Sequence, residues 1–142
     1  MKKHIFVILL LSSYFSFSQE VKDFKKKTEN NALERTEILD LLRTEIKKDI
    51  NQDVQFVVKH LKVSGKYAWF EGEALRKDGK KIEFPDDSYE CCNVGGLFEK
   101  KEGKWTTLKS GNFSTDCWYC EITNQYPYIP KIIFSESVLN SK

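Results

Sequence analysis

The chain has 142 residues, of which 31% are charged and 40% hydrophobic, and its formal net charge is +2. A chain of this length supports one folded domain with a hydrophobic core of its own. Binding to duplex nucleic acid needs clustered basic residues, so the near balance of charge argues against a nucleic-acid partner.

The first 18 residues have the pattern of a secretory signal peptide. Lys2 and Lys3 precede an unbroken apolar run, and a Ser-Phe-Ser sequence supplies small residues before an expected cleavage site at Gln19. The apolar stretch is shorter than the roughly 20 residues that span a bilayer. We therefore expect export to the periplasm or the extracellular medium, with no membrane span after cleavage.

Residues 19–30 are polar and rich in lysine, which predicts a linker. An amphipathic helix is expected to start at Asn31 and to end near Asn51. Asn31 is a good cap residue, and Glu34 lies three residues later, where it would complete a capping box. The apolar stripe of this helix consists of Leu33, Ile38, Leu39, Leu42, Ile46 and Ile50.

Five strand-like segments follow, at residues 54–63, 67–76, 81–84, 90–100 and 104–110. Tight turns join most of them, so neighbouring strands must be antiparallel. The aromatic, proline-broken tail after Cys120 is expected to dock on the body as a short turn or helix. The predicted fold class is therefore α+β, a single domain over residues 31–142. In it, one long N-terminal helix packs on a curved antiparallel sheet of four to five strands.

The segment 67–76 has two different faces when it is extended. One face carries small residues and Phe70, which suits close packing against the helix. The other face is a candidate surface for a ligand or partner if the sheet is concave there, and an ordinary solvated sheet face otherwise. Its residues are Tyr67, Trp69, Glu71 and Glu73.

All four cysteines lie between residues 89 and 120, as the vicinal pair Cys91 and Cys92 and the C-x-x-C pair Cys117 and Cys120. In an exported chain this predicts structural disulfides, with a zinc site or a redox dithiol as the alternatives. A bond within the vicinal pair would be strained, so we favour bridges from one pair to the other, worth about 3–4 kcal/mol. The pairing itself stays open, and no metal or cofactor is expected.

Trp118 and Tyr119 are adjacent, so only one of them can face inward if the chain is extended there. The other is a candidate contact for a protein or glycan partner. Asp116 can stabilise a turn at Cys117, or it can take part in a site.

Several short segments carry a recognisable order and spacing. They include Arg35-x-x-Ile38-Leu39-Asp40-x-Leu42-Arg43, Val54-x-Phe56-Val57-Val58, Ala68-Trp69-Phe70 and Gly103-Lys104-Trp105. In these segments the chain resembles a group of small exported bacterial proteins of unassigned function, with a helix-plus-sheet arrangement similar to cystatin-like and nuclear-transport-factor-like folds. The resemblance covers about residues 31–122. It implies a helix seated in a cupped sheet and an exported location, and it brings no catalytic residues.

Few residues suited to catalysis are available. His60 is the only histidine after the predicted cleavage site, and the common hydrolase and nucleotide-binding motifs are absent. We therefore predict an exported, non-catalytic binding module for a protein or a small ligand. One alternative is an enzyme with a site in the sheet concavity, using Glu71, Glu73 or Asp116. Another is a thiol–disulfide protein that uses Cys117 and Cys120.

Overall fold

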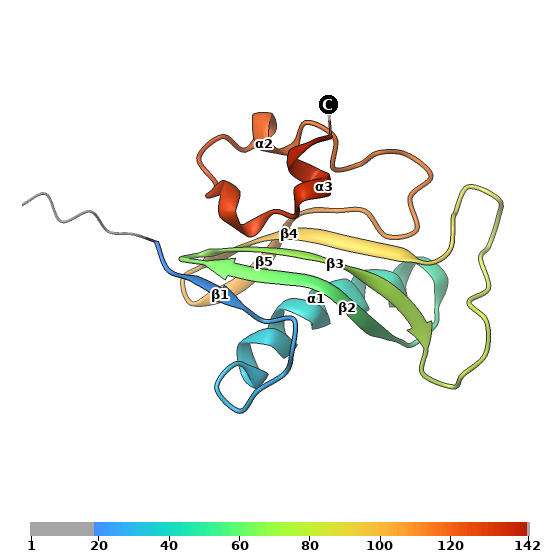
Figure 1. Cartoon of the computed structure of the whole chain (residues 1–142). Coiled ribbons are helices and arrows are strands. Elements are labelled where there is room, and N and C mark those ends of the chain that lie inside the picture. Colours follow the sequence, from blue (N-terminus) through green and yellow to red (C-terminus); the bar gives the residue numbers. More distant parts are fainter. Residues whose placement is uncertain (1–18, 142) are drawn as a thin grey trace, which may run out of the picture.

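The computed structural model describes residues 19–141, so the predicted signal peptide lies outside the described residues. An antiparallel five-stranded sheet with the strand order β1-β2-β3-β4-β5 forms the centre of the molecule. Helix α1 lies on one face of this sheet, and the short helices of the C-terminal segment lie on the other (Figure 1). The predicted α+β class, with one long helix preceding an antiparallel sheet, is confirmed.

In chain order the elements are β1 (Val21–Asp23), α1 (Ala32–Ile50), β2 (Val54–Ser64), β3 (Tyr67–Arg76), β4 (Asn93–Lys101), β5 (Lys104–Ser110), α2 (Ile122–Gln125), the 3-10 helix η1 (Lys131–Ile133) and α3 (Glu136–Leu139). Within residues 19–141, no helix has the length and apolar character needed to cross a membrane.

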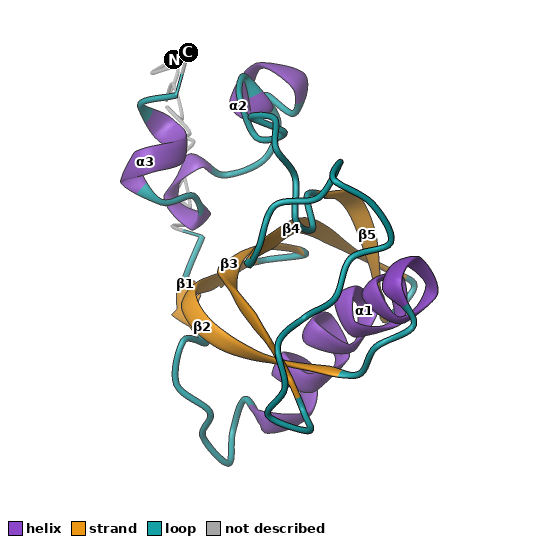
Figure 2. Cartoon of the chain, turned by 90° about the vertical axis from the view of Figure 1, so that its right-hand side faces the viewer, coloured by secondary structure: helices purple, strands orange, loops and turns teal. Residues whose placement is uncertain are grey.

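The main core lies between α1 and the sheet, and Figure 2 shows the helix lying against the strands. Ile38, Leu42 and Ile46 of the predicted stripe are fully buried and pack in one cluster with Phe70 of β3. Burial of each such side chain stabilises the fold by about 1.5–3 kcal/mol. The helix ends at Asn51, which adopts the left-handed conformation with φ 53°. An ending at this position was predicted.

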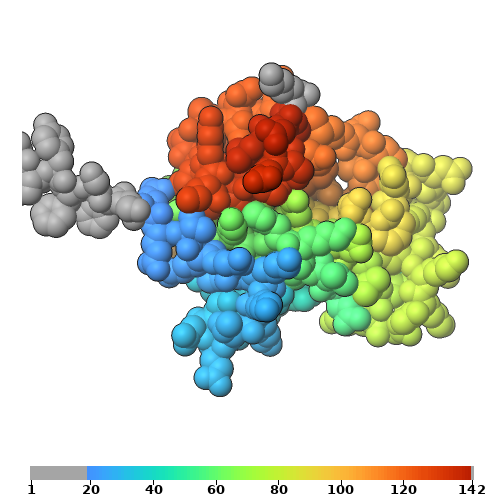
Figure 3. Space-filling model, in the orientation of Figure 1, coloured from blue at the N-terminus to red at the C-terminus, as the bar shows by residue number. Residues whose placement is uncertain are grey.

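A second core lies on the opposite face of the sheet. Tyr67 and Trp69 of β3 are buried there beneath the C-terminal segment, which covers the strands on the upper side of Figure 3. The side chains that this segment contributes are Ile122, Ile129, Ile133, Phe134 and Val138. The predicted docking of the tail is confirmed, and the docked tail makes the sheet apolar on both faces.

The segment 19–30 differs from the expected linker, because it contains β1. Val21 to Asp23 pair with the end of β2, and the Phe24 amide donates to the Leu61 carbonyl at 2.8 Å. Phe24 is buried in the main core, and Arg35 of α1 donates to its carbonyl oxygen. Burial of this one aromatic residue ties a lysine-rich segment to the domain.

The predicted capping box at the start of α1 does not form. The Asn31 side chain accepts a hydrogen bond from the Thr28 amide and donates to the Lys26 carbonyl, so it closes the preceding loop. Glu34 instead accepts from Lys100 and from the Trp105 indole, across the sheet. Tertiary contacts therefore use the groups that local capping would have used.

The short strand expected at 81–84 is a loop. The Gln52 side chain donates to the Glu83 carbonyl and accepts from the Glu83 amide at 3.0 Å, so it satisfies backbone groups that a strand neighbour would otherwise satisfy. The neighbour of β3 is β4, which begins at Asn93 and not at Glu90. Asp78 and Gly79 do form a turn, with Gly79 at φ 76°.

Candidate functional site

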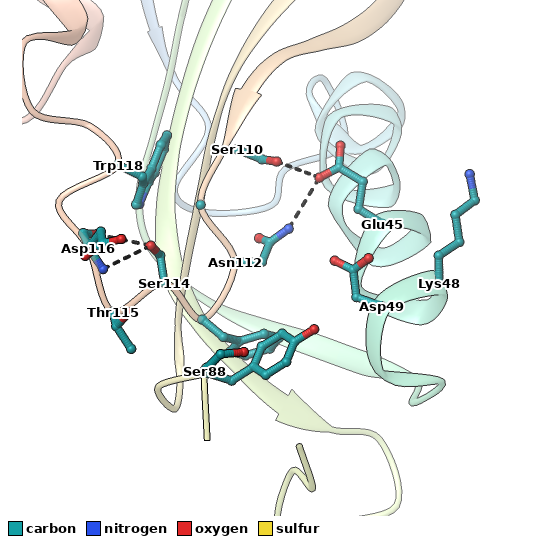
Figure 4. A pocket seen from close by; sticks show the side chains of 13 residues that line it. Glu45, Lys48, Asp49, Ser88, Ser110, Asn112, Ser114, Thr115, Asp116 and Trp118 are labelled. Atoms are coloured by element: carbon teal, nitrogen blue, oxygen red, sulfur yellow. Dashed lines mark hydrogen bonds between the residues drawn. The ribbon is translucent and has the colours of Figure 1, made fainter. Parts of the chain in front are cut away.

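Two cavities meet at Trp118, and each lies against a different layer of the molecule. The first, which we call the α1 groove, has a volume of about 550 Å³ and lies between α1 and the segment 110–118. Figure 4 shows Glu45, Lys48 and Asp49 on the helix side of this groove, with Ser110, Asn112 and Asp116 across from them. Its lining is therefore mainly polar, with three carboxylates and one ammonium group among these residues.

Glu45 is held in the α1 groove by two hydrogen bonds. One of its carboxylate oxygens accepts hydrogen bonds from Ser110 Oγ at 2.8 Å and from Asn112 Nδ2 at 3.3 Å. Asn112 Oδ1 is buried and has no hydrogen-bond partner among residues 19–141. A buried acceptor without a partner costs about 1–3 kcal/mol, so Asn112 holds Glu45 in place at a cost to the stability of the fold.

The second cavity, which we call the tail pocket, has a volume of about 230 Å³ and lies between the outer face of the sheet and the C-terminal segment. Glu71 of β3 and Lys59 of β2 contribute its charged groups, and Val94 contributes an apolar surface. Trp118 and Tyr119 form its aromatic wall, and Ser137 and Val138 close it from the side of α3.

Trp118 separates the two cavities and is held from several sides. A Cβ placed on Gly111 would lie 2.1 Å from three atoms of the indole, so the ring occupies the space that any other residue at position 111 would need. The ring also stacks on Trp69, with 5.3 Å between the centroids, and contacts Tyr119 edge to face. Its position is therefore fixed by packing.

The six side chains proposed from sequence for ligand binding are only partly brought together. Glu71, Trp118 and Tyr119 line the tail pocket. Tyr67 and Trp69 are buried in the second core, where Trp69 supports the pocket by donating its indole N–H to Glu71. Glu73 makes an ion pair with Lys59 beside the pocket.

The cysteines do not form the bridges that we favoured. Cys117 bonds Cys120, with 5.4 Å between their Cα atoms, and the sulfurs of Cys91 and Cys92 lie together. The segment 117–120 is not extended, because the Cys120 amide donates to the Cys117 carbonyl in a tight turn. This turn is the reason that Trp118 and Tyr119 both pack inward, where an extended chain would have allowed only one.

The residues of the enzyme alternative lie in different places. Glu71 lines the tail pocket, whereas Asp116 lines the α1 groove and its backbone forms a turn with Ser114 and Trp118. His60 lies under the tail, where its Nε2 donates to the Ile133 carbonyl at 2.7 Å. In residues 19–141, no group of three or more histidine, cysteine and acidic side chains is placed to hold a metal ion.

Sequence reasoning missed Glu45, Asn112 and the serine at 110. Glu45 looked like one of many charged residues on the solvent side of the helix, and only the return of the chain after β5 places it in a groove. The signal that was available was Ser110-Gly-Asn112, a small polar loop directly after a strand.

Comparisons with protein-family models, curated proteins and solved structures find no match to this chain.

Proposed function

We propose that this protein is an exported, non-catalytic binding module that holds a small, polar ligand in the α1 groove. The observation that carries the proposal is the carboxylate of Glu45, held by Ser110 and Asn112 in an open cavity of about 550 Å³. This volume falls in the range typical of small-molecule sites. The element order supports a cystatin-like arrangement, with a helix seated in a cupped sheet, as part of the same proposal.

The groove favours a ligand that is rich in hydrogen-bond donors and neutral or cationic. Glu45, Asp49 and Asp116 outnumber Lys48, so an anion would be repelled on balance. The carboxylates can accept only, so the ligand has to supply donors to them. Polyamines and sugars have this chemistry, whereas carboxylic acids do not.

The test is a thermal-shift screen of the purified protein against polyamines, monosaccharides and small carboxylic acids, followed by calorimetry on any compound that stabilises the fold. We expect Glu45→Ala to weaken binding by about tenfold or more, because it removes an acceptor that carries charge. The matched control is Glu37→Ala, since Glu37 is an exposed carboxylate on the same helix. Stabilisation by carboxylic acids, or equal affinity for the two variants, would contradict the proposal.

Export is tested separately, by sequencing the N-terminus of the protein recovered from the cell envelope and medium of its host. A mature chain that begins at Gln19 is the expected result. A cytoplasmic protein that keeps Met1 to Ser18 would contradict this part of the proposal and leave the binding part to be judged on its own.

A further inference from the structure

The tail pocket is a second and chemically different cavity. It shares only Gly111 and Trp118 with the α1 groove. Its volume of about 230 Å³ is less than half that of the groove, and aromatic side chains form one of its walls. An occupant must therefore be compact and partly apolar.

Glu71 presents a carboxylate whose orientation is fixed by two neutral donors. Its Oε1 atom accepts hydrogen bonds from the Trp69 indole N–H and from Ser135 Oγ. Neither donor carries a charge, so the two bonds hold the carboxylate in place without neutralising it. Lys59, the ammonium group that also lines the pocket, makes its ion pair with Glu73. Glu71 is thus left without a cationic partner among the contacts of residues 19–141.

The aromatic wall supplies apolar surface. Trp118 and Tyr119 stand edge to face, with 5.8 Å between ring centroids and an interplanar angle of 89°. Trp118 also stacks on Trp69 and lies against Gly111, so the wall contacts the apolar part of a ligand and presents no free indole face to a cation. The disulfide between Cys117 and Cys120 brackets these two rings, so the wall is preorganised and little ordering is needed on binding.

We propose that the tail pocket binds a small organic ammonium ion, whose N–H groups donate to Glu71 and whose apolar part contacts Trp118 and Tyr119. Val94 and Val138 complete the apolar surface. A carboxylate ligand would be repelled by Glu71, and a neutral ligand of the same shape would lose the charge-assisted hydrogen bond. The proposal concerns a different cavity from the α1 groove and does not depend on it.

Benzylamine is a suitable probe, because benzyl alcohol and benzoate match its shape and differ in charge. Titration calorimetry on the purified protein at neutral pH should give a measurable affinity for benzylamine. We expect benzyl alcohol to bind at least about tenfold more weakly than benzylamine, and benzoate not to bind. No heat of binding with benzylamine at low-millimolar concentration, or equal affinities for benzylamine and benzyl alcohol, would overturn the proposal.

Three glutamate variants locate the bound probe. Glu71→Gln keeps an oxygen acceptor for Trp69 and Ser135, so the fold should persist, and benzylamine affinity should fall about tenfold or more. Glu45→Gln, in the α1 groove, should change the affinity by less than about twofold. Glu73→Gln should also lower the affinity, because it releases Lys59 to pair with Glu71 in the same pocket. An unchanged affinity in Glu71→Gln, or a loss in Glu45→Gln alone, would assign benzylamine to another site and overturn the proposal.

Discussion

Gly111 shows how one residue without a side chain positions the wall between the two cavities. A methyl group at this position would overlap Cγ, Cδ1 and Cδ2 of the Trp118 indole, each 2.1 Å away. We predict that Gly111→Ala forces the indole to move and destabilises the fold by about 1–3 kcal/mol, as overpacked sites do. Urea unfolding gives the free energy, and near-ultraviolet circular dichroism reports the ring.

The neighbouring exposed residue Thr115 provides the control for Gly111→Ala. Thr115→Ala removes atoms at the edge of the α1 groove and should change the free energy of unfolding by less than about 0.5 kcal/mol. Equal stabilities and equal near-ultraviolet spectra for the two variants would show that Trp118 does not depend on the glycine.

Glu99 is the residue for which a pH dependence can be predicted. Its side chain is 10% exposed and pairs with Lys66 at 3.1 Å and Lys101 at 3.3 Å. The hydrogen bond from Lys66, followed by that from Lys101, lowers the pKa of this carboxyl below its ordinary value. A carboxyl with a lower pKa in the folded state stabilises the fold above the pKa of the unfolded chain, about 4.3, and loses this contribution as the pH falls.

Glu99→Gln should therefore be less stable than the parent protein at about pH 7, and the difference should be smaller at about pH 3, which lies below the pKa of the unfolded chain. Urea unfolding of both proteins at the two pH values measures the difference. Glu102→Gln, an exposed neighbour in the β4–β5 turn, should show no such change. A stability gap for Glu99→Gln that is the same at both pH values would exclude the proposed charge interaction.

At the scale of elements, the turn 117–120 determines what the cysteines do. A bridge between residues three apart in sequence closes a small loop, for which the chain-entropy relation gives about 2 kcal/mol, against about 3–4 kcal/mol for a bridge between the two pairs. Its main effect is therefore on the position of Trp118 and Tyr119. The Cys117–Cys120 disulfide thus constrains one turn and does not link distant parts of the fold.

Tryptic digestion without reductant tests this pairing. Four lysines, at positions 100, 101, 104 and 109, separate the two cysteine pairs. We predict two unlinked peptides, one with Cys91 and Cys92 and one with Cys117 and Cys120, each lighter by two hydrogens than its reduced form. Peptides joined across these lysines would support the long-range bridges instead, and digestion after reduction gives the reference masses.

Much of the element order could be predicted from sequence, because it depends on local signals. Strands β3 and β5 have the predicted bounds, since tight turns fix where each begins. β1 was missed because three residues carry too short a pattern, and only their pairing with β2 makes them a strand. The groove around Glu45 depends on the return of a loop to a helix, which no local pattern records.

The burial of Trp69 shows a different limit. One face of β3 carries two aromatic residues followed by two glutamates, a mixture typical of a half-exposed strand, so the pattern could not reveal a covering layer. The covering layer is the C-terminal tail, whose short helices have little periodic sequence pattern. Its apolar residues form a layer only in the folded structure, where Ile133 and Phe134 pack on Trp69. A sheet buried on both faces therefore looked, from sequence, like a sheet buried on one.

At the scale of the whole molecule, β3 couples the two cores, because its successive side chains enter opposite layers. Leu42 belongs to the core under α1 and Ile133 to the core under the tail, and both are fully buried. We predict that Leu42→Ala and Ile133→Ala each cost about 2–5 kcal/mol and each shift a single unfolding transition. Far-ultraviolet circular dichroism follows α1. Tryptophan fluorescence follows the surroundings of Trp69 and Trp118, with a contribution from Trp105 in the core under α1 that Trp105→Phe removes.

The unfolding transitions measured by circular dichroism and by fluorescence should coincide in both variants. Both cores pack on β3, so loss of either core removes the support of the other. Ile132→Ala is the matched control for the tail, since Ile132 is 57% exposed and contributes little burial. If Ile133→Ala released the fluorescence change at lower urea than the helix signal, the tail would be a separately folding layer. The tail pocket would then open independently of the α1 groove, and ligands of the two cavities would stabilise different transitions.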